Sequence, residues 1–284
     1  PLVEENICES VKNNVFGTFN LAEAALKYNV LNFVLISSDK AVRSTNIMGA
    51  TKRLSEICVQ SLYDNQNQQS KFAIVRFGNV LESSGSVIPK FKQQIKQGGP
   101  VTLTHPDVTR YFMTIIEASQ LVIQAGAMAE KCEVFVLDMG ESIKIKNLIV
   151  KMIKLSGLSV KDDKNLDGDI EIKITGLRPG EKLYEELLIG ENPKKTYHEK
   201  IQKAKDSFIP FNKLKIDLDY LSNLIEDNKV DKVKHMLSSL VPSYKSNSII
   251  VDHFYEQKSN SKPELKPSKI INSDQYKVIR IKTK

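Results

Sequence analysis

Residues 32–37 read Asn-Phe-Val-Leu-Ile-Ser, an apolar run too short for a helix and without polar alternation. Such runs are typical of parallel strands that are buried on both faces of a sheet. Upstream, residues 10–28 carry apolar side chains three and four positions apart, which predicts an amphipathic helix. Downstream, residues 48–64 return to the helical period, and residues 72–77 read as a second buried strand. The order helix, strand, helix, strand predicts a doubly wound parallel α/β sheet.

The rest of the chain predicts shorter elements. Helical spacing recurs in residues 86–97, 116–129 and 143–155. Short apolar or alternating runs predict strands at 101–104, 133–138 and 170–175. A further helix is expected to follow residues 178–181 and to run to about residue 188, and one or two short helices are expected within 213–240. These elements are enough for a smaller mixed α/β lobe beside the main sheet.

The composition is that of an ordinary globular protein, with 41% hydrophobic and 26% charged residues. The net charge is +7, but residues 257–284 hold eight Lys or Arg and two acidic residues, so six of these charges lie in that segment. The body therefore has no basic surplus, which argues against a nucleic-acid partner, and the basic tail is expected to be disordered. No apolar run reaches the roughly 20 residues that a transmembrane helix needs.

Metal and disulfide sites are not predicted. The three cysteines are an odd number without CxxC spacing, which fits a reducing cytoplasm. His105 and His198 stand alone, without the spacing of metal ligands.

Polar residues follow both central strands. Ser37, Ser38, Asp39 and Lys40 leave the first strand, and Asn79 follows the second. Ligands of open α/β sheets bind beyond the carboxyl ends of the strands, so both segments are expected to line a ligand site.

A hydroxyl, a carboxyl group and an amine lie side by side at residues 38–40. Such a set can run an elimination, in which one group removes a proton next to a carbonyl and another protonates the leaving oxygen. The alternative is structural, with Ser38 or Asp39 capping the next helix and Lys40 as a surface charge. These three residues alone favour the structural interpretation.

The continuation favours the functional one. Residues 37–53 (SSDKAVRSTNIMGATKR) resemble the active-site stretch of the extended short-chain dehydrogenase/reductase superfamily, in which a Tyr-x-x-x-Lys pair opens the helix. Here the pair is Met48 and Lys52. Met in the Tyr position, with Asp39-Lys40 upstream, resembles the nucleoside-diphosphate-sugar 4,6-dehydratases of capsule, O-antigen and protein-glycan synthesis. Five further stretches extend the resemblance to about residue 202: 13–18, 76–81, 84–89, 109–113 and 176–186.

The resemblance implies a Rossmann-like catalytic domain over residues 1–202, with its substrate lobe mainly in 80–115 and 140–202. Residues 203–256 are expected to form a helical C-terminal extension, followed by the tail 257–284. The resemblance also implies NAD as the cofactor and a UDP-sugar as the substrate. Among UDP-sugars, UDP-N-acetylglucosamine is the first candidate.

The implied roles are specific. Lys40 would remove the proton on C5 of a 4-keto sugar, and Asp39, protonated, would give a proton to the departing C6 hydroxyl. Both must be neutral at that moment, which requires burial and mutual tuning. Met48 cannot take the C4 hydroxyl proton, so Ser38 or an ordered water would stand in. Ser37 and Lys52 would contact the cofactor, with Lys52 at the nicotinamide ribose.

A UDP group needs positive charge and backbone or amide donors at its diphosphate. The resemblance implies Arg110 and Arg178 for this role, with Asn79 as an amide donor. Ser86 and Val87 open a helix that would face the uridine, and Glu181 would accept from ribose hydroxyls. The plain alternatives are a tight turn at 178–181 and an ordinary ion pair for Arg110.

The glycine-rich loop that holds the NAD pyrophosphate does not occur in the sequence. In the family it lies upstream of the position that corresponds to Pro1, as do several membrane helices in many members. The sequence is therefore expected to be a fragment without the first strands of its sheet, weakly active or inactive alone. The protein is expected to be cytoplasmic, and it would lie at the inner face of a membrane only through a missing N-terminal region. Self-association through helices 10–28 and 48–64 is also expected.

Two alternatives stay open. A nucleotide-sugar epimerase also begins with hydride transfer, but it needs no acid to expel the C6 hydroxyl. Asp39-Lys40 therefore favours the dehydratase over the epimerase. A non-catalytic nucleotide-sugar-binding module is suggested by Met48, which could mark an inactive enzyme, and by the expected truncation.

Overall fold

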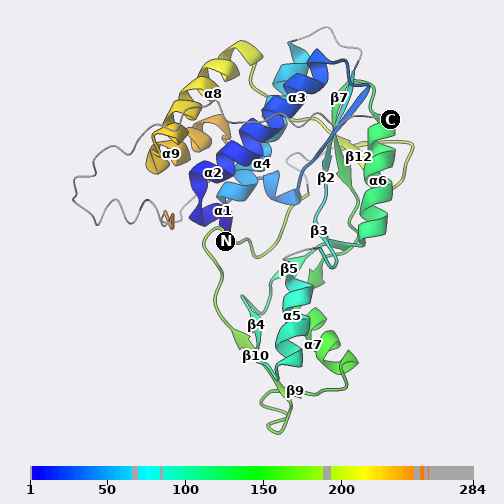
Figure 1. The fold of residues 1–284 in the computed structure, drawn as a ribbon. Helices are drawn as coiled ribbons and strands as arrows, with labels where there is room; N and C mark the ends of the chain where they lie inside the picture. The colour runs from blue at the N-terminus through cyan, green and yellow to red at the C-terminus, as the bar shows by residue number, and fades with distance from the viewer. Residues whose placement is uncertain are drawn as a thin grey trace, which may run out of the picture.

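The computed structural model describes residues 2–65, 70–83, 86–187, 193–245, 250–252 and 255. Parallel strands form the centre of its main sheet (Figure 1). β1 (Asn32–Ile36), β2 (Lys71–Arg76) and β7 (Cys132–Leu137) pair in parallel in that order. β12 (Ile201–Ala204) and β11 (Lys194–Lys195) continue the sheet antiparallel beside β7.

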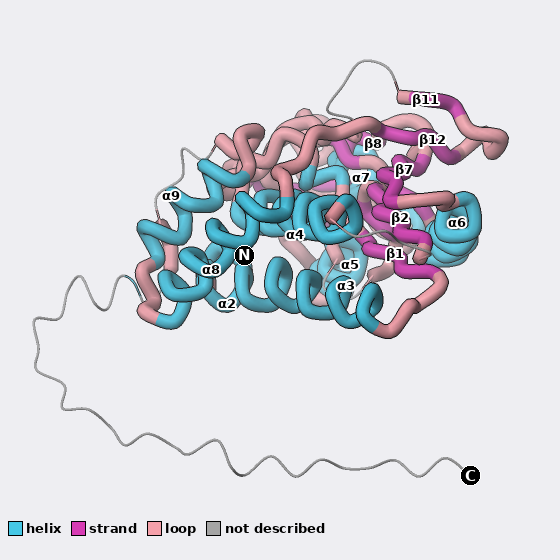
Figure 2. The backbone as a smooth tube through the Cα atoms, turned by 90° about the horizontal axis from the view of Figure 1, so that it is seen from above, coloured by secondary structure: helices cyan, strands magenta, loops and turns pink. Residues whose placement is uncertain are grey.

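Helices cover both faces of this sheet. α3 (Gly17–Lys27) and α4 (Ile47–Asp64) lie on one face, and α6 (Ile115–Met128) lies on the other (Figures 1 and 2). The side chains of β2 alternate accordingly: Phe72 and Ile74 pack with α3 and α4, whereas Ala73 and Val75 pack with α6. The predicted doubly wound α/β sheet is confirmed, with the antiparallel strands β11 and β12 as an addition.

β1 corrects one expectation, because it is not buried on both faces. Phe33, Val34 and Leu35 are half-buried, and Ile36 is 43% exposed. Within the described ranges β1 pairs with β2 alone, so it forms an edge of the sheet. Its unbroken apolar run thus belongs to an edge that leaves apolar surface accessible.

The first helical segment begins earlier than predicted and is not uniform. α1 (Leu2–Glu5) and α2 (Ile7–Val11) precede a π-helical turn, η1 (Lys12–Phe16), which leads into α3. Within this turn the carbonyl of Asn14 accepts a hydrogen bond of 2.7 Å from the Ser55 hydroxyl on α4. The wider turn therefore joins the two helices.

The smaller lobe lies beyond the carboxyl ends of the main strands (Figure 1). Its parallel sheet has the order β4 (Val101–Leu103), β10 (Ile170–Ile174) and β9 (Val160–Lys161). α5 (Val87–Lys96) and α7 (Ile145–Leu155) pack with these strands around a separate apolar core that contains Phe91, Ile149 and Ile170.

Two short strand pairs lie where the chain passes between the lobes. β3 (Asn79–Val80) pairs with β6 (Phe112–Met113), and β5 (Thr109–Arg110) pairs with β8 (Ile143–Lys144). Because these pairs connect the two lobes, they fix residues from both sides of the junction.

α8 (Phe211–Glu226) and α9 (Val230–Leu240) pack on α2 and α4, away from the sheet (Figure 2). Their leucines share one apolar core with Val11 and Leu54, and the Ile7 N–H donates to the Asp252 carboxylate at 3.0 Å. This side of α4 is therefore covered by the chain itself. Self-association stays a prediction.

The helix expected between residues 181 and 188 does not form over the described part of that segment. Residues 181–187 contain bends and no helical turn, because their polar groups bond to other segments: the Lys182 ammonium donates to the Val42 carbonyl at 2.8 Å, and Thr109 N–H donates to the Leu183 carbonyl at 3.1 Å. The tail 257–284 lies outside the described residues. None of the described helices has both the length and the apolarity of a membrane span.

Candidate active site

The segment after β1 places the predicted acid and base. η2, a 3-10 turn over Asp39–Ala41, follows Ser38, whose hydroxyl accepts from Lys40 N–H at 3.3 Å. The Asp39 side chain is fully buried, and its Oδ1 accepts from Ser38 Oγ and from Lys40 Nζ, each at 2.9 Å. The structural reading of Ser38 as a cap therefore holds, and the three side chains also touch one another.

Two glycines permit this close packing. A Cβ on Gly49, in the first turn of α4, would lie 2.1 Å from the Lys40 carbonyl oxygen. A Cβ on Gly78, at the end of β2, would lie 3.3 Å from Asp39 Oδ2 and 3.0 Å from the Tyr111 Cβ. Any larger residue at Gly49 would push η2 away from α4 and would displace Lys40.

Lys40 is held from two further elements. Its ammonium donates to Asn79 Oδ1 on β3 at 3.2 Å and lies 3.8 Å from Glu185 Oε1. Asn79 in turn donates its side-chain amide to the Tyr111 carbonyl at 3.2 Å. The amine of Lys40 therefore stands between two carboxyl groups, Asp39 and Glu185, with one side still facing the cavity.

Arg110 extends the cluster on β5. Its guanidinium bonds to Glu181 Oε1 at 3.2 Å and to the Leu183 carbonyl at 3.3 Å, and it lies 3.7 Å from Glu185 Oε1. Glu181 also accepts from the Thr104 hydroxyl at 3.0 Å. The arrangement is thus a chain of charges from Glu181 through Arg110 and Glu185 to Lys40.

Glu185 is a site residue that sequence reasoning missed. Its side chain is only 4% exposed, and its Oε2 is buried without a hydrogen-bond partner among the described residues. Burial raises the pKa of Glu185; Lys40 and Arg110 oppose this rise, and Asp39 adds to it. The one available signal was a pair of acids at 185–186 in a stretch wrongly expected to be helical.

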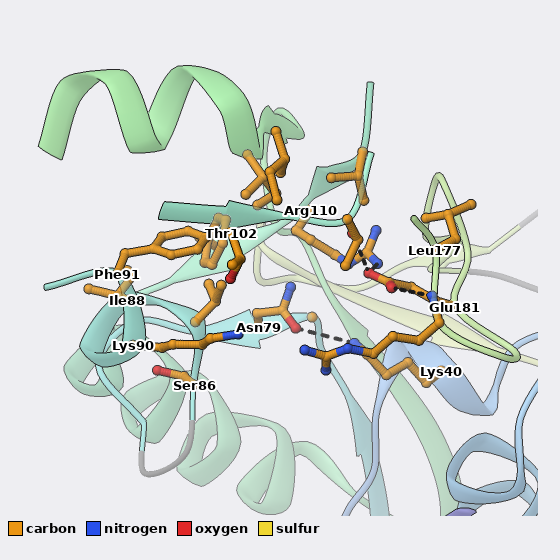
Figure 3. A pocket seen from close by; sticks show the side chains of 18 of the residues that line it. Lys40, Asn79, Ser86, Ile88, Lys90, Phe91, Thr102, Arg110, Leu177 and Glu181 are labelled. Carbon is orange, nitrogen blue, oxygen red and sulfur yellow. Dashed lines mark hydrogen bonds and ion pairs between the residues drawn. The ribbon is translucent and has the colours of Figure 1, made fainter. Parts of the chain in front are cut away.

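A cavity of about 970 Å³ lies between the two lobes at this cluster. Figure 3 shows side chains of α5 on one side of it, Leu177 and Glu181 on the other, and Asn79, Arg110 and Lys40 between them. A cavity of this volume can bury a ligand of nucleotide-sugar size. Nine of the predicted site residues line it: Ser38, Lys40, Met48, Asn79, Ser86, Val87, Arg110, Arg178 and Glu181.

The residues predicted to contact the uridine and the diphosphate lie around this cavity. Ser86 is the residue before α5, and its hydroxyl is buried without a partner among the described residues. Arg178 is exposed at the cavity edge, in a turn closed by a hydrogen bond of 3.1 Å from its N–H to Glu181 Oε2. The turn interpretation and the binding interpretation of 178–181 are therefore compatible.

Ser37 and Lys52 do not line this cavity. The Ser37 hydroxyl donates to Glu56 Oε1 at 2.6 Å, and Lys52 Nζ makes a long hydrogen bond of 3.5 Å to the Ile36 carbonyl at the end of β1. Burial lowers the pKa of Lys52, and Glu56 opposes this shift. Both residues lie on the β1 side of the site, so their cofactor role stays a prediction.

A buried network of ion pairs lies behind the site, where Ser37, Arg76 and α4 meet. Glu56 on α4 bonds to Arg76 Nε at 2.7 Å and to Arg53 at 2.9 Å, and Arg76 also pairs with Asp206. Arg76 and Glu56 are fully buried. Burial alone would raise the pKa of Glu56, but the two arginines and Ser37 outweigh it and hold that pKa below its usual range. The network joins β1, β2, α4 and the segment after β12.

The described residues contain no cluster of three or more His, Cys, Asp or Glu that could hold a metal ion. His105 accepts from the Asp107 N–H, and His198 accepts from the Lys200 N–H, so each imidazole has a local structural contact.

Comparison with known proteins decides the family. Residues 1–206 match the family described as "Polysaccharide biosynthesis protein". The chain belongs to this family. It is 52% identical over 236 residues to "Capsular polysaccharide biosynthesis protein CapD" of Staphylococcus aureus, a match that covers 82% of this chain and 37% of CapD. The chain thus corresponds to little more than a third of that relative.

Solved structures agree with the fold. "X-ray structure of Pen from Bacillus thuringiensis" is 31% identical with a TM-score of 0.63, covering 77% of this chain and 71% of that chain. A dTDP-glucose 4,6-dehydratase from Bacillus anthracis, solved with NAD, is 17% identical with a TM-score of 0.51, covering 59% and 57%, and shows the fold alone. This member of the polysaccharide biosynthesis family therefore has a Rossmann-type α/β fold, which it shares with nucleotide-sugar-modifying enzymes.

Proposed function

We propose that the protein, in its full natural length, dehydrates a UDP-sugar to a 4-keto-6-deoxy sugar nucleotide for surface polysaccharide or glycan synthesis. UDP-N-acetylglucosamine is the first candidate substrate. The observation that carries the proposal is the contact of 2.9 Å between the Asp39 carboxyl and the Lys40 amine, at the edge of a cavity of nucleotide-sugar size. An elimination of water needs such an acid and base within reach of adjacent carbons.

NAD is proposed to bind on the β1 side of the site. Lys52 is half-buried, and within the described part of the chain its ammonium donates just one hydrogen bond, the long one to the Ile36 carbonyl. Its other N–H groups are therefore suited to ribose hydroxyls, and Ser37 follows Ile36 at the same strand end. NAD, when bound there, would supply reversible hydride transfer to and from the sugar.

The chain's own groups account for the proton movements. Lys40 would remove the C5 proton, and Asp39 would protonate the C6 hydroxyl, which then leaves as water. Ser38, which lines the cavity and donates to Asp39, would pass the C4 hydroxyl proton to the Asp39 carboxylate, because Met48 cannot take it. Asp39 would give this proton to the departing C6 hydroxyl. Lys40 would return the proton that it took to C5 as the methyl group forms at C6, so both groups end in the state in which they began.

Substrate binding is proposed for the other side of the cavity. Arg110 and Arg178 would face the diphosphate, and Asn79 would donate an amide hydrogen bond. Ser86 and Val87 would approach the uracil, because a buried hydroxyl without a protein partner is suited to a ligand. Glu181 would accept from the ribose hydroxyls.

The test measures the mass of the sugar nucleotide after incubation with UDP-N-acetylglucosamine and NAD. Because the glycine-rich loop that holds the NAD pyrophosphate does not occur in the sequence, the test uses the protein in its full natural length. This parent is expected to remove one water, and Lys40→Ala in the same background is expected to remove none. A changed sugar of unchanged mass would point to an epimerase instead. Tight binding without any turnover would point to a binding module.

Arg178→Ala is expected to weaken UDP binding by about 10- to 100-fold, because a charge-assisted hydrogen bond to a phosphate contributes about 1.5–3 kcal/mol. Titration calorimetry with UDP measures this directly. Arg43→Ala is the matched control, since Arg43 is also exposed but pairs with Glu186 outside this cavity. Equal affinities of the two variants would remove Arg178 from the substrate site.

A further inference from the structure

Glu185 stands between the two cations of the site. Its Oε1 lies 3.8 Å from Lys40 Nζ on one side and 3.7 Å from Arg110 Nε on the other. Neither distance is a direct hydrogen bond, so the carboxylate acts on both cations chiefly through its charge. Burial strengthens that action, because a charge away from water is weakly screened.

Carboxylates and cations alternate in this cluster. Asp39 of η2 and two acids of the loop 181–187, Glu181 and Glu185, face Lys40 of η2 and Arg110 of β5, and Lys182 of that loop adds a more distant positive charge. Burial raises the pKa of Glu185, and its Oε2 has no hydrogen-bond partner among the described residues.

We propose that Glu185 is a positioning residue for the dehydration, which controls through its charge how readily Lys40 gives up its proton and so when Lys40 can act as a base. The inference rests on the proposed function, and it extends that function to a residue outside the Asp39–Lys40 pair.

The direction of the effect follows from the geometry. An ionised Glu185, 3.8 Å from the Lys40 amine, stabilises its ammonium form. Removing that charge therefore makes the neutral amine of Lys40 available at lower pH. The acidic limb of the pH–rate profile should move to lower pH in Glu185→Gln, which keeps the size of the side chain.

The experiment compares Glu185→Gln with Glu186→Gln. Trace acetic anhydride labels neutral amines, and peptide mass spectrometry reports the labelling rate of Lys40 at a fixed pH near 8. Glu185→Gln is expected to label about five- to tenfold faster than the parent, which corresponds to a loss of one nearby opposite charge. Glu186→Gln removes the neighbouring carboxylate, which pairs with the exposed Arg43, and is expected to leave Lys40 unchanged.

Glu185→Asp separates charge from shape. It keeps the carboxylate, and its labelling rate is expected to stay within about twofold of the parent. Unchanged labelling of Lys40 in Glu185→Gln, or an equal increase in Glu186→Gln, would overturn the proposal. Since labelling needs neither substrate nor cofactor, it tests Glu185 even if the protein proves not to release water from a UDP-sugar.

Discussion

Asp39→Asn is expected to lower the rate of water loss by about 10²- to 10⁴-fold, the usual contribution of a general acid or base. Asn has nearly the same shape, and its amide oxygen can still accept from Ser38 and Lys40, but an amide cannot release a proton to a leaving hydroxyl. Substrate affinity should change little, because Asn keeps the size of the side chain and the residues proposed to bind the diphosphate and the uracil lie elsewhere around the cavity. Steady-state kinetics with UDP-N-acetylglucosamine separates kcat from KM.

Asp138→Asn is the control for this prediction. Asp138 follows β7 at the same edge of the main sheet, is exposed, and accepts from Gly140 N–H at 2.9 Å. It is expected to keep the parent rate. If Asp39→Asn kept more than about a tenth of the parent rate while folding normally, Asp39 could not be the general acid.

Glu56→Gln is expected to destabilise the protein by about 3–5 kcal/mol, because it leaves two buried arginines, Arg53 and Arg76, with Asp206 as their one shared carboxylate in the network. Urea unfolding followed by circular dichroism measures the loss. The same carboxylate predicts a pH dependence. Its pKa is held below the usual range in the folded state, so its stabilisation is present above the unfolded pKa and is lost as the pH falls through the folded pKa.

Glu82→Gln serves as the comparison, since Glu82 pairs with Lys92 on the surface and both side chains are 61% exposed. Exposed pairs contribute little, so its unfolding midpoint should match the parent's. A similar small effect for Glu56→Gln, or the same acid sensitivity in parent and variant, would contradict the role assigned to the buried network.

The main sheet was predictable because strand and helix periods are local properties of the chain. Residues 32–37, 48–64 and 72–77 each carry their pattern within a short window, and the structure places elements at each of them. The exposure of β1 was not predictable in this way. An apolar run indicates a strand suited to burial, whereas its neighbours in the sheet depend on other parts of the chain.

Residues 181–187 show the opposite case, in which tertiary contacts override a local pattern. Lys182 and Leu183 bond to segments far away in the sequence, and these bonds hold the loop open. The same loop brings Glu185 to Lys40, a contact across 145 positions that no spacing rule reports. The cavity itself was predictable from the strand ends, while the charge chain that borders it required the fold.

The packing of α8 and α9 has a consequence for the order in which the protein is made. Ile7 and Val11 share a core with Leu237 and Leu240. The helix α2 therefore cannot complete its packing until α8 and α9 have been synthesised. At about 5–20 residues per second, translation takes on the order of ten to forty seconds to span the sequence between them. Until then one side of α4 is uncovered, and a chaperone on the nascent chain is best placed to protect it.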